Sequence, residues 1–107
     1  MICTPIKLDK TRNMLLGFGA MQLFKKITGK SLTKVNWDEE DTEDILPILY
    51  YCGLKHEDES LDIEKTIRLL DEHLGIKGAS ELLPQIFKDA GLSAEDDIKN
   101  AQGTAVK

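Results

Sequence analysis

The chain has 107 residues, of which 31% are charged and 41% hydrophobic, and its net charge is −5 at pH 7. These values are typical of one globular domain. The acidic balance argues against a nucleic-acid-binding protein, which needs a basic surface.

The N-terminal residues lack the basic segment and long apolar run of a secretory leader. Cys3 and Cys52 are the only cysteines, too few for a disulfide framework. The most apolar run, 14–24, is shorter than the about 20 residues that a membrane-spanning helix needs. We therefore expect a cytoplasmic protein with reduced thiols and no membrane association.

Residues 1–11 are predicted to form a short strand or an extended N-terminal arm, because Pro5 disfavours a helix and apolar residues alternate with polar ones. A helix is predicted from about residue 12 to Thr28, with Gly29 as its end. Gly17 and Gly19 weaken this helix, so they either allow another backbone to approach or delay the helix start.

The predicted helix has two apolar faces. One is an ordinary core stripe, and it consists of Leu16, Ala20, Leu23, Phe24 and Ile27. The opposite face carries Met14, Phe18 and Met21. Either this second face is also covered by the domain, or it is a partner-binding patch, for which the flexible Met side chain is well suited.

Six acids in 38–44 resemble a metal site, but their spacing does not match a calcium-binding loop. We interpret them as the start of a helix over 45–52, where acids favour the positive end of the helix dipole. Pro47 is expected near its first turn and Gly53 at its end.

A third helix is predicted behind an N-cap at Ser60, and it ends at Gly75. A fourth is predicted over about Ser80 to Ala90, and a short one after Ser93. Residues 102–107 are expected to form a flexible tail. The predicted fold is an all-α bundle of four to five helices in one domain over 1–107.

Charge is unevenly distributed along the chain. Residues 1–35 carry seven basic side chains and one acidic, whereas 36–107 carry seven basic and eighteen acidic ones. Either both regions are simply solvated, or the basic end of one copy contacts the acidic end of the next. The residues assigned to such self-association are Lys25, Lys26, Lys30, Glu39, Glu40 and Asp41.

Sequence motifs of catalysis are not found. The chain has no nucleophile elbow, phosphate-binding glycine loop or His-Glu-x-x-His motif. Cys52 and His56 are four residues apart, but no second pair of metal ligands lies near them in the sequence. We therefore expect a non-enzyme without a metal site or cofactor.

Three segments resemble the tail assembly chaperones of long-tailed bacteriophages and prophages. Residues 23–32, LFKKITGKSL, resemble a family helix that ends in Thr-Gly followed by Leu. Residues 45–54, ILPILYYCGL, resemble the second family helix, which closes on Gly-Leu. Residues 61–75, which contain Ile67-Arg68-Leu69-Leu70, resemble a third family helix. The similarity covers roughly residues 12–90, and it departs from the family in the almost wholly apolar run 14–24.

The resemblance implies a helical protein that binds the tape-measure protein, a long apolar chain that sets tail length, and keeps it soluble. It also implies several copies on that chain and their displacement by tail-tube protein. The alternative function is that of an acidic helical adaptor or regulator with another protein partner.

Overall fold

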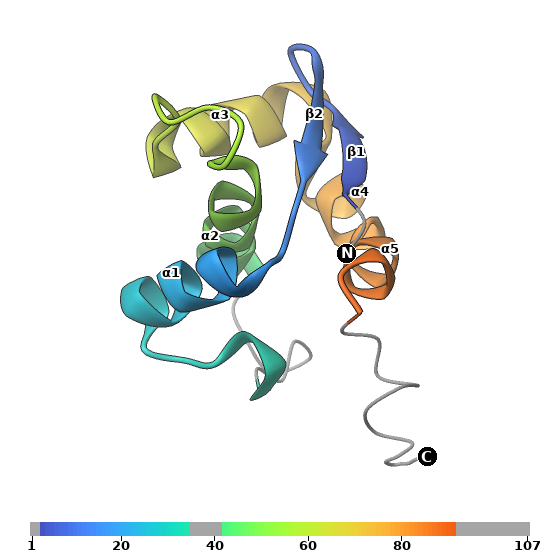
Figure 1. Cartoon of the computed structure of the whole chain (residues 1–107). Helices are drawn as coiled ribbons and strands as arrows, with labels where there is room; N and C mark the ends of the chain where they lie inside the picture. Colours follow the sequence, from blue (N-terminus) through green and yellow to red (C-terminus); the bar gives the residue numbers. More distant parts are fainter. Residues whose placement is uncertain (1–2, 35–41, 92–107) are drawn as a thin grey trace.

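The computed structural model describes residues 3–34 and 42–91. In these ranges the element order is β1 (Thr4–Lys7), β2 (Thr11–Met14), α1 (Phe18–Thr28), the 3-10 helix η1 (Leu32–Lys34), α2 (Thr42–Leu54), α3 (Ile63–His73), α4 (Gly75–Glu81) and α5 (Leu83–Asp89). The described part is thus mostly helical, as predicted, with one small sheet at its N-terminal end (Figure 1). The acidic run up to Asp41, the short helix after Ser93 and the tail 102–107 lie outside the described residues.

The N-terminal strands correct the all-α prediction. β1 and β2 form an antiparallel hairpin in which Thr4 pairs with Met14 and Lys7 with Thr11. Residues 12–14 are therefore strand and not helix. Burial alternates from Arg12 through Met14 to Leu16, which is the two-residue period of an extended segment. The two apolar faces predicted for one helix therefore combine residues of β2 with residues of α1.

Helix α1 starts late, at Phe18, because Gly17 is extended and serves as its N-cap. The helix ends as predicted. Gly29 has a φ of +78°, and its N–H donates to the Lys25 carbonyl at 2.7 Å. A residue with a Cβ rarely adopts this left-handed conformation, so glycine suits the end of the helix.

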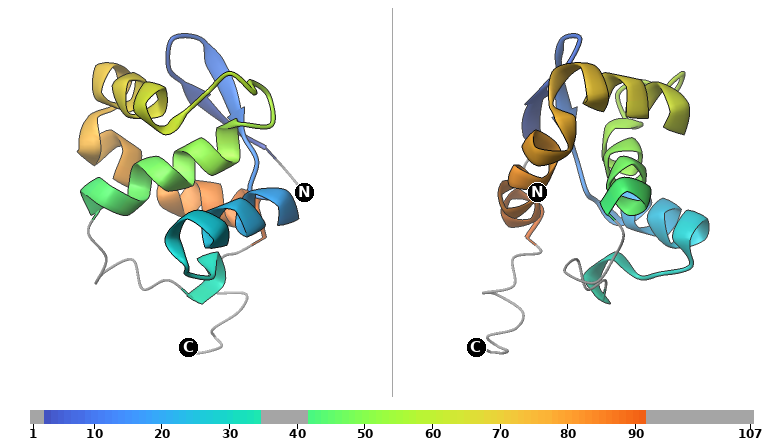
Figure 2. Two further views of the ribbon diagram at one scale, coloured as in Figure 1. Left: turned by 90° about the vertical axis from the view of Figure 1, so that its left-hand side faces the viewer. Right: turned by 180° about the vertical axis from the view of Figure 1, so that it is seen from behind.

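Helix α2 lies at the centre of the fold and contacts α1, α3, α4 and β2 (Figures 1 and 2). It buries residues on nearly all sides, including Leu46, Leu49 and Tyr50. The Tyr50 hydroxyl donates to the Ala79 carbonyl at 2.9 Å and so ties α2 to α4. Burial raises the pKa of this hydroxyl, which therefore stays protonated at neutral pH.

The C-terminal helices differ from their predicted bounds. α3 is capped by Asp62, whose carboxylate accepts from the Lys65 N–H at 2.7 Å. The chain then turns at Gly75, which has a φ of +72°. Two short helices, α4 and α5, follow where one helix over 80–90 was predicted.

A single core joins the hairpin to the helices. Its buried hydrophobic members among the described residues are Ile6, Leu8, Met14, Leu16, Phe24, Leu32, Ile45, Leu46, Leu49, Tyr50, Cys52, Leu54, Leu61, Leu69, Leu70, Ala79 and Ile86. Because β2 contributes Met14 and then leads through Leu16 into α1, the hairpin determines where α1 begins relative to α2.

Candidate partner-binding surface

The three residues of the predicted binding patch are not on one surface. Met14 is only 1% exposed, Met21 is half-buried against the core, and Phe18 is 80% exposed. The predicted surface position of Met14 is therefore wrong. Met14 belongs to β2 and lies against Gly53 of α2, where a Cβ would come within 2.5 Å of the Met14 sulfur. Gly53 thus gives β2 room beside α2. It was predicted to end α2, but the helix continues to Leu54.

The predicted basic residues do lie at the surface. Lys25, Lys26 and Lys30 are exposed on the last turns of α1 and the turn behind it. Their predicted acidic counterparts, Glu39, Glu40 and Asp41, lie outside the described residues. Association through these charges stays a prediction.

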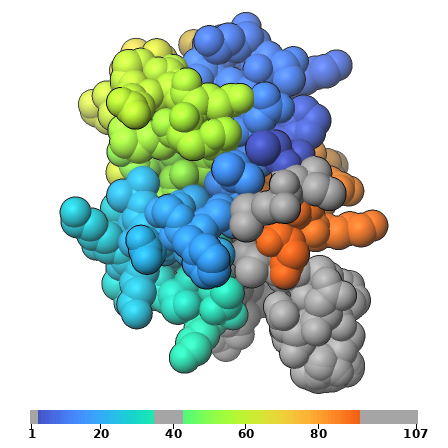
Figure 3. All heavy atoms as spheres, viewed as in Figure 1, coloured from blue at the N-terminus to red at the C-terminus, as the bar shows by residue number. Residues whose placement is uncertain are grey.

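An open groove lies between α1 and the C-terminal end of α2, and we call it the α1–α2 groove. Its volume is about 460 Å³. On one side it is lined by the segment that leads into α1 and by α1 itself, and on the other by α2 and the loop behind it. The lining residues are Leu15, Gly17, Gly19, Ala20, Leu23, Cys52, Lys55, His56 and Glu59. Figure 3 shows the yellow-green loop residues directly above the blue-to-cyan α1 on one face of the molecule.

Small residues widen the α1 side of this groove. A Cβ added to Gly19 meets nothing within 4 Å, so the space beside this residue is open. Leu15 and Leu23 are each half-buried and offer apolar surface nearby. Small and apolar residues thus line the α1 side of the groove, and Lys55, His56 and Glu59 line the opposite side.

The polar residues of the groove are held by bonds of their own. His56 Nε2 lies 2.7 Å from the Asn13 carbonyl oxygen. The Lys55 ammonium donates to the carbonyls of Glu59 at 3.2 Å and Leu61 at 3.3 Å. Burial raises the pKa of the Cys52 thiol to about 12, so the thiol is protonated at neutral pH and is not an activated nucleophile.

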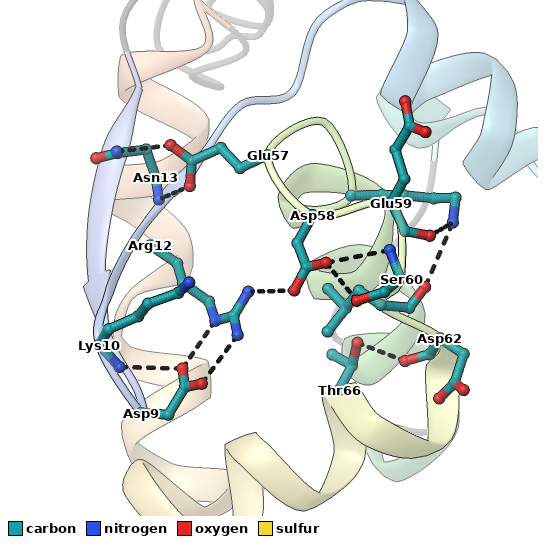
Figure 4. A network of polar contacts seen from close by, with 12 residues as sticks. Asp9, Lys10, Arg12, Asn13, Glu57, Asp58, Glu59, Ser60, Asp62 and Thr66 are labelled. Carbon is teal, nitrogen blue, oxygen red and sulfur yellow. Dashed lines mark hydrogen bonds and ion pairs between the residues drawn. The ribbon is translucent and has the colours of Figure 1, made fainter.

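A buried arginine joins β2 to the loop behind α2, close in sequence to Glu59 of the groove (Figure 4). Arg12 of β2 is 3% exposed, and its guanidinium donates to both Asp9 oxygens, at 2.8 and 2.9 Å. It also donates to Asp58, in the loop behind α2, at 3.2 Å. The hydrogen bond from Arg12 lowers the pKa of Asp9 to about 2, and the bonds from Ser60 and then Arg12 lower the pKa of Asp58 to about 2.

Asn13 adds a second connection between strand and loop. Its backbone N–H and its side-chain amide donate to the two Glu57 oxygens, each at 2.8 Å, and these bonds lower the Glu57 pKa. No motif or spacing in the sequence indicated a role for Arg12, Asn13 or Glu57. The sequence offers one indication of the ion pair, which is that Asp9 lies three residues before Arg12. The two residues fall where the predicted N-terminal arm gives way to the predicted helix.

A second apolar hollow lies at the other end of α2, and we call it the α2–α3–α4 groove. Its volume is about 210 Å³. It is lined by Glu43, Leu46, Pro47, Ile67, Leu70, Asp71, Gly75, Ile76 and Ala79. Ile76 is 62% exposed and Ile67 is 38% exposed, so apolar surface extends beyond the hollow itself.

Among residues 3–34 and 42–91, no three His, Cys, Asp or Glu side chains are grouped so that they could hold a metal ion. Within the same ranges, every helix is too short or too polar to cross a membrane. No family model, curated protein or solved structure matches the chain.

Proposed function

We propose that this protein is a phage tail assembly chaperone that binds the tape-measure protein through the α1–α2 groove. The observation that carries the proposal is this open groove, with its apolar and small residues on α1. A long apolar chain that forms helices needs such a surface, because packing its apolar side chains into a groove shields them from water.

The resemblance supports the proposal through the position of its three segments. Residues 23–32 form the second half of α1 and the start of η1, residues 45–54 lie in α2, and residues 61–75 include α3. These helices are neighbours, since α2 contacts both α1 and α3. The similar segments thus form one continuous part of the molecule, which includes one side of the groove.

The groove also suits a temporary complex. Its outer residues are polar and its apolar area is limited to a few side chains, so a bound helix keeps part of its surface available to other proteins. Tail-tube protein is then able to displace the chaperone as the tail grows.

Gly19 offers a direct test, because it lines the groove and its side-chain direction is open. We expect Gly19→Leu to fill the groove and abolish solubilisation of the tape-measure protein encoded near this gene, when the two are co-expressed. Gly19→Ala adds one methyl group and is the matched control, which retains binding. Both substitutions favour the helix by replacing glycine.

The measurement is the fraction of tape-measure protein in the soluble lysate and its co-purification with each variant. Circular dichroism verifies that both variants are folded. If Gly19→Leu solubilises the partner as well as the wild type does, the groove is not the binding site. If the wild-type protein itself fails to solubilise it, the chaperone function is wrong and the adaptor alternative is favoured.

A further inference from the structure

We propose that the α2–α3–α4 groove binds a basic amphipathic helix of another protein. One large apolar side chain of that helix enters the hollow, and its lysine or arginine side chains pair with Glu43 and Asp71. This site lies at the opposite end of α2 from the α1–α2 groove, and it does not depend on the tape-measure protein. It is supported by the size of the hollow, by the apolar surface around it and by the two carboxylates.

The floor of the groove belongs to the hydrophobic core. Leu46 of α2, Leu70 of α3 and Ala79 of α4 are all buried and all line it. The left view of Figure 2 shows the start of α2 (green) beside the region where α3 (yellow) passes into α4 (gold), away from the start of α1 (blue). Because these three helices contact one another, the hollow is bounded by elements that pack together in the fold.

The volume of the groove fits one side chain and not a whole helix. An apolar cavity of about 150 Å³ lined by aliphatic side chains binds benzene, and this groove has about 210 Å³. Pockets for drug-sized ligands start at about 300 Å³, so a bulky cofactor does not fit. The hollow itself therefore accepts one leucine or phenylalanine side chain of a partner.

Apolar surface continues outward from the hollow. Ile76 is 62% exposed and Ile67 is 38% exposed, and they are two of the four exposed large hydrophobic side chains among the described residues. Apolar surface gathered beside a hollow is typical of an interaction site. An amphipathic helix covers it with the apolar residues that lie one turn before and one turn after the inserted side chain.

The charges at the groove select a basic partner. Glu43 and Asp71 come from different helices and are both exposed, and neither has an ion pair with another described residue. The groove has no lysine or arginine among its lining residues. Pro47 has no N–H, so the carbonyl of Glu43 lacks the donor that an α-helix normally provides four residues later. Two carboxylates and one carbonyl acceptor thus complement lysine and arginine side chains.

The test uses a fluorescent helical peptide of alanine and lysine with one central phenylalanine, and it measures binding by anisotropy at low salt. We expect saturable binding to the wild type. Glu43→Gln combined with Asp71→Asn keeps the shape of both side chains and removes their charge, so it should weaken binding at least ~10-fold. Ile76→Ala removes apolar surface and should weaken binding about 5-fold.

The matched control removes the same amount of charge elsewhere. Glu64→Gln combined with Glu72→Gln neutralises two exposed acids of α3 that do not line the groove. This variant should bind within about 2-fold of the wild type, because its charges are separated from the peptide by solvent. Thermal melts verify that all variants are folded, which is expected because the substituted side chains are exposed.

Two further peptides separate the hollow from the charges. A peptide with alanine in place of the phenylalanine lacks the side chain that fills the hollow, and it should bind at least ~10-fold more weakly. A peptide with glutamate in place of lysine should not bind, because it repels Glu43 and Asp71.

Methyl NMR of isotope-labelled isoleucine locates the peptide on the wild-type protein. The signals of Ile67 and Ile76 should shift on titration, whereas that of Ile27 in α1 should not. The Gly19→Leu variant, which fills the α1–α2 groove, should bind the peptide as the wild type does. Failure of this proposal and failure of the chaperone function are therefore separate results.

Three results would overturn the proposal. They are a wild type that does not bind the lysine peptide, a variant without the Glu43 and Asp71 charges that binds it as tightly as the wild type, and a titration that shifts the Ile27 signal in place of those of Ile67 and Ile76.

Discussion

Met14 of β2 packs against Gly53 of α2, and this contact explains why a glycine lies inside the helix. The sulfur and terminal methyl of Met14 occupy the space where a Gly53 side chain would start, at 2.5 and 2.6 Å from a Cβ built there. The Leu15 N–H also donates to the Gly53 carbonyl at 2.9 Å. A glycine inside a helix is therefore retained here for packing, against its own helix propensity.

We predict that Gly53→Ala destabilises the protein by less than about 1 kcal/mol, because the end of the flexible Met14 side chain must shift within the core, and this repacking outweighs the ~1 kcal/mol gained in helix propensity only slightly. In a Met14→Ala background the added methyl has room, so the same substitution should be neutral or stabilising. Urea unfolding of the wild type, both single variants and the double variant measures this coupling. An equal cost in both backgrounds would mean that the contact does not determine the choice of glycine.

Single residues are also where sequence reasoning failed most clearly. Met14 and Phe18 are four apart, a spacing that helical periodicity places on one face, yet one is buried and the other is 80% exposed. The apolar run crosses from a strand into a helix at Gly17, and no periodicity within the run marks that change. The alternative that the glycines delay the helix was the correct one.

At the scale of elements, two nearby polar residues have different roles at the start of α3: Ser60 holds the loop and Asp62 caps the helix. Ser60 was predicted to cap this helix, but its N–H and hydroxyl both donate to Asp58. Asp62 instead accepts from the Lys65 N–H, and its carbonyl accepts from the Thr66 hydroxyl at 2.8 Å. Because Ser60 is hydrogen-bonded to Asp58 in the loop, the N-cap of α3 is Asp62, two residues later than predicted.

We predict that Asp62→Ala lowers the free energy of unfolding by about 1 kcal/mol, the usual cost of losing an N-cap. Ser60→Ala should change it by less than about 0.5 kcal/mol, as is common for exposed positions. Chemical denaturation followed by circular dichroism compares the two. A larger loss in Ser60→Ala than in Asp62→Ala would restore the sequence-based assignment of the cap.

Helix positions were predictable where apolar spacing was regular, as in α2 and α3, and where glycine ends α1. α4 was not, because Gly75 and Gly78 have low helix propensity. Its Ala79 is buried and its carbonyl accepts from Tyr50, so contact with α2 supports a helix that the local sequence does not favour.

At the scale of the whole molecule, Arg12 joins the hairpin to the helical body. It has hydrogen bonds to Asp9 within the hairpin and to Asp58 behind α2. Both carboxyl groups have a pKa of about 2 in the folded protein, against an ordinary value of 3.8. Their charged forms therefore favour the folded state, and this stabilisation is complete above 3.8 and disappears as the pH falls towards 2.

We predict that Arg12→Met destabilises the protein by about 1.5 kcal/mol at neutral pH, because two partly exposed carboxylates lose a charged donor. Its deficit relative to the wild type should shrink as the pH falls from 3.8 towards 2, where the carboxyl groups become protonated. Urea midpoints measured across this range test the prediction, with Lys10→Met as the exposed control in the same turn. A deficit that is independent of pH would show that Arg12 stabilises through packing alone.

The mostly helical architecture and the extended N-terminal segment could be predicted from composition and spacing, whereas β2, its pairing with β1 and the two grooves could not. Both grooves depend on residues far apart in sequence, such as Gly19 with Glu59 and Leu46 with Ile76. Their existence follows from how α2 contacts its neighbours, and no local pattern encodes those contacts. The family resemblance and the function derived from it remain predictions.

The Thr4 hydroxyl donates to Asp89 at 2.6 Å, and it thereby joins the first strand to the last described helix. During synthesis the ribosome releases β1 long before α5, so the hairpin must wait for its C-terminal neighbour while some eighty residues are translated. Throughout that interval the nascent chain lacks the packing of α5 against β1, whereas β2 can already contact α2. The native contacts of β1 are thus complete only after α5 has left the ribosome.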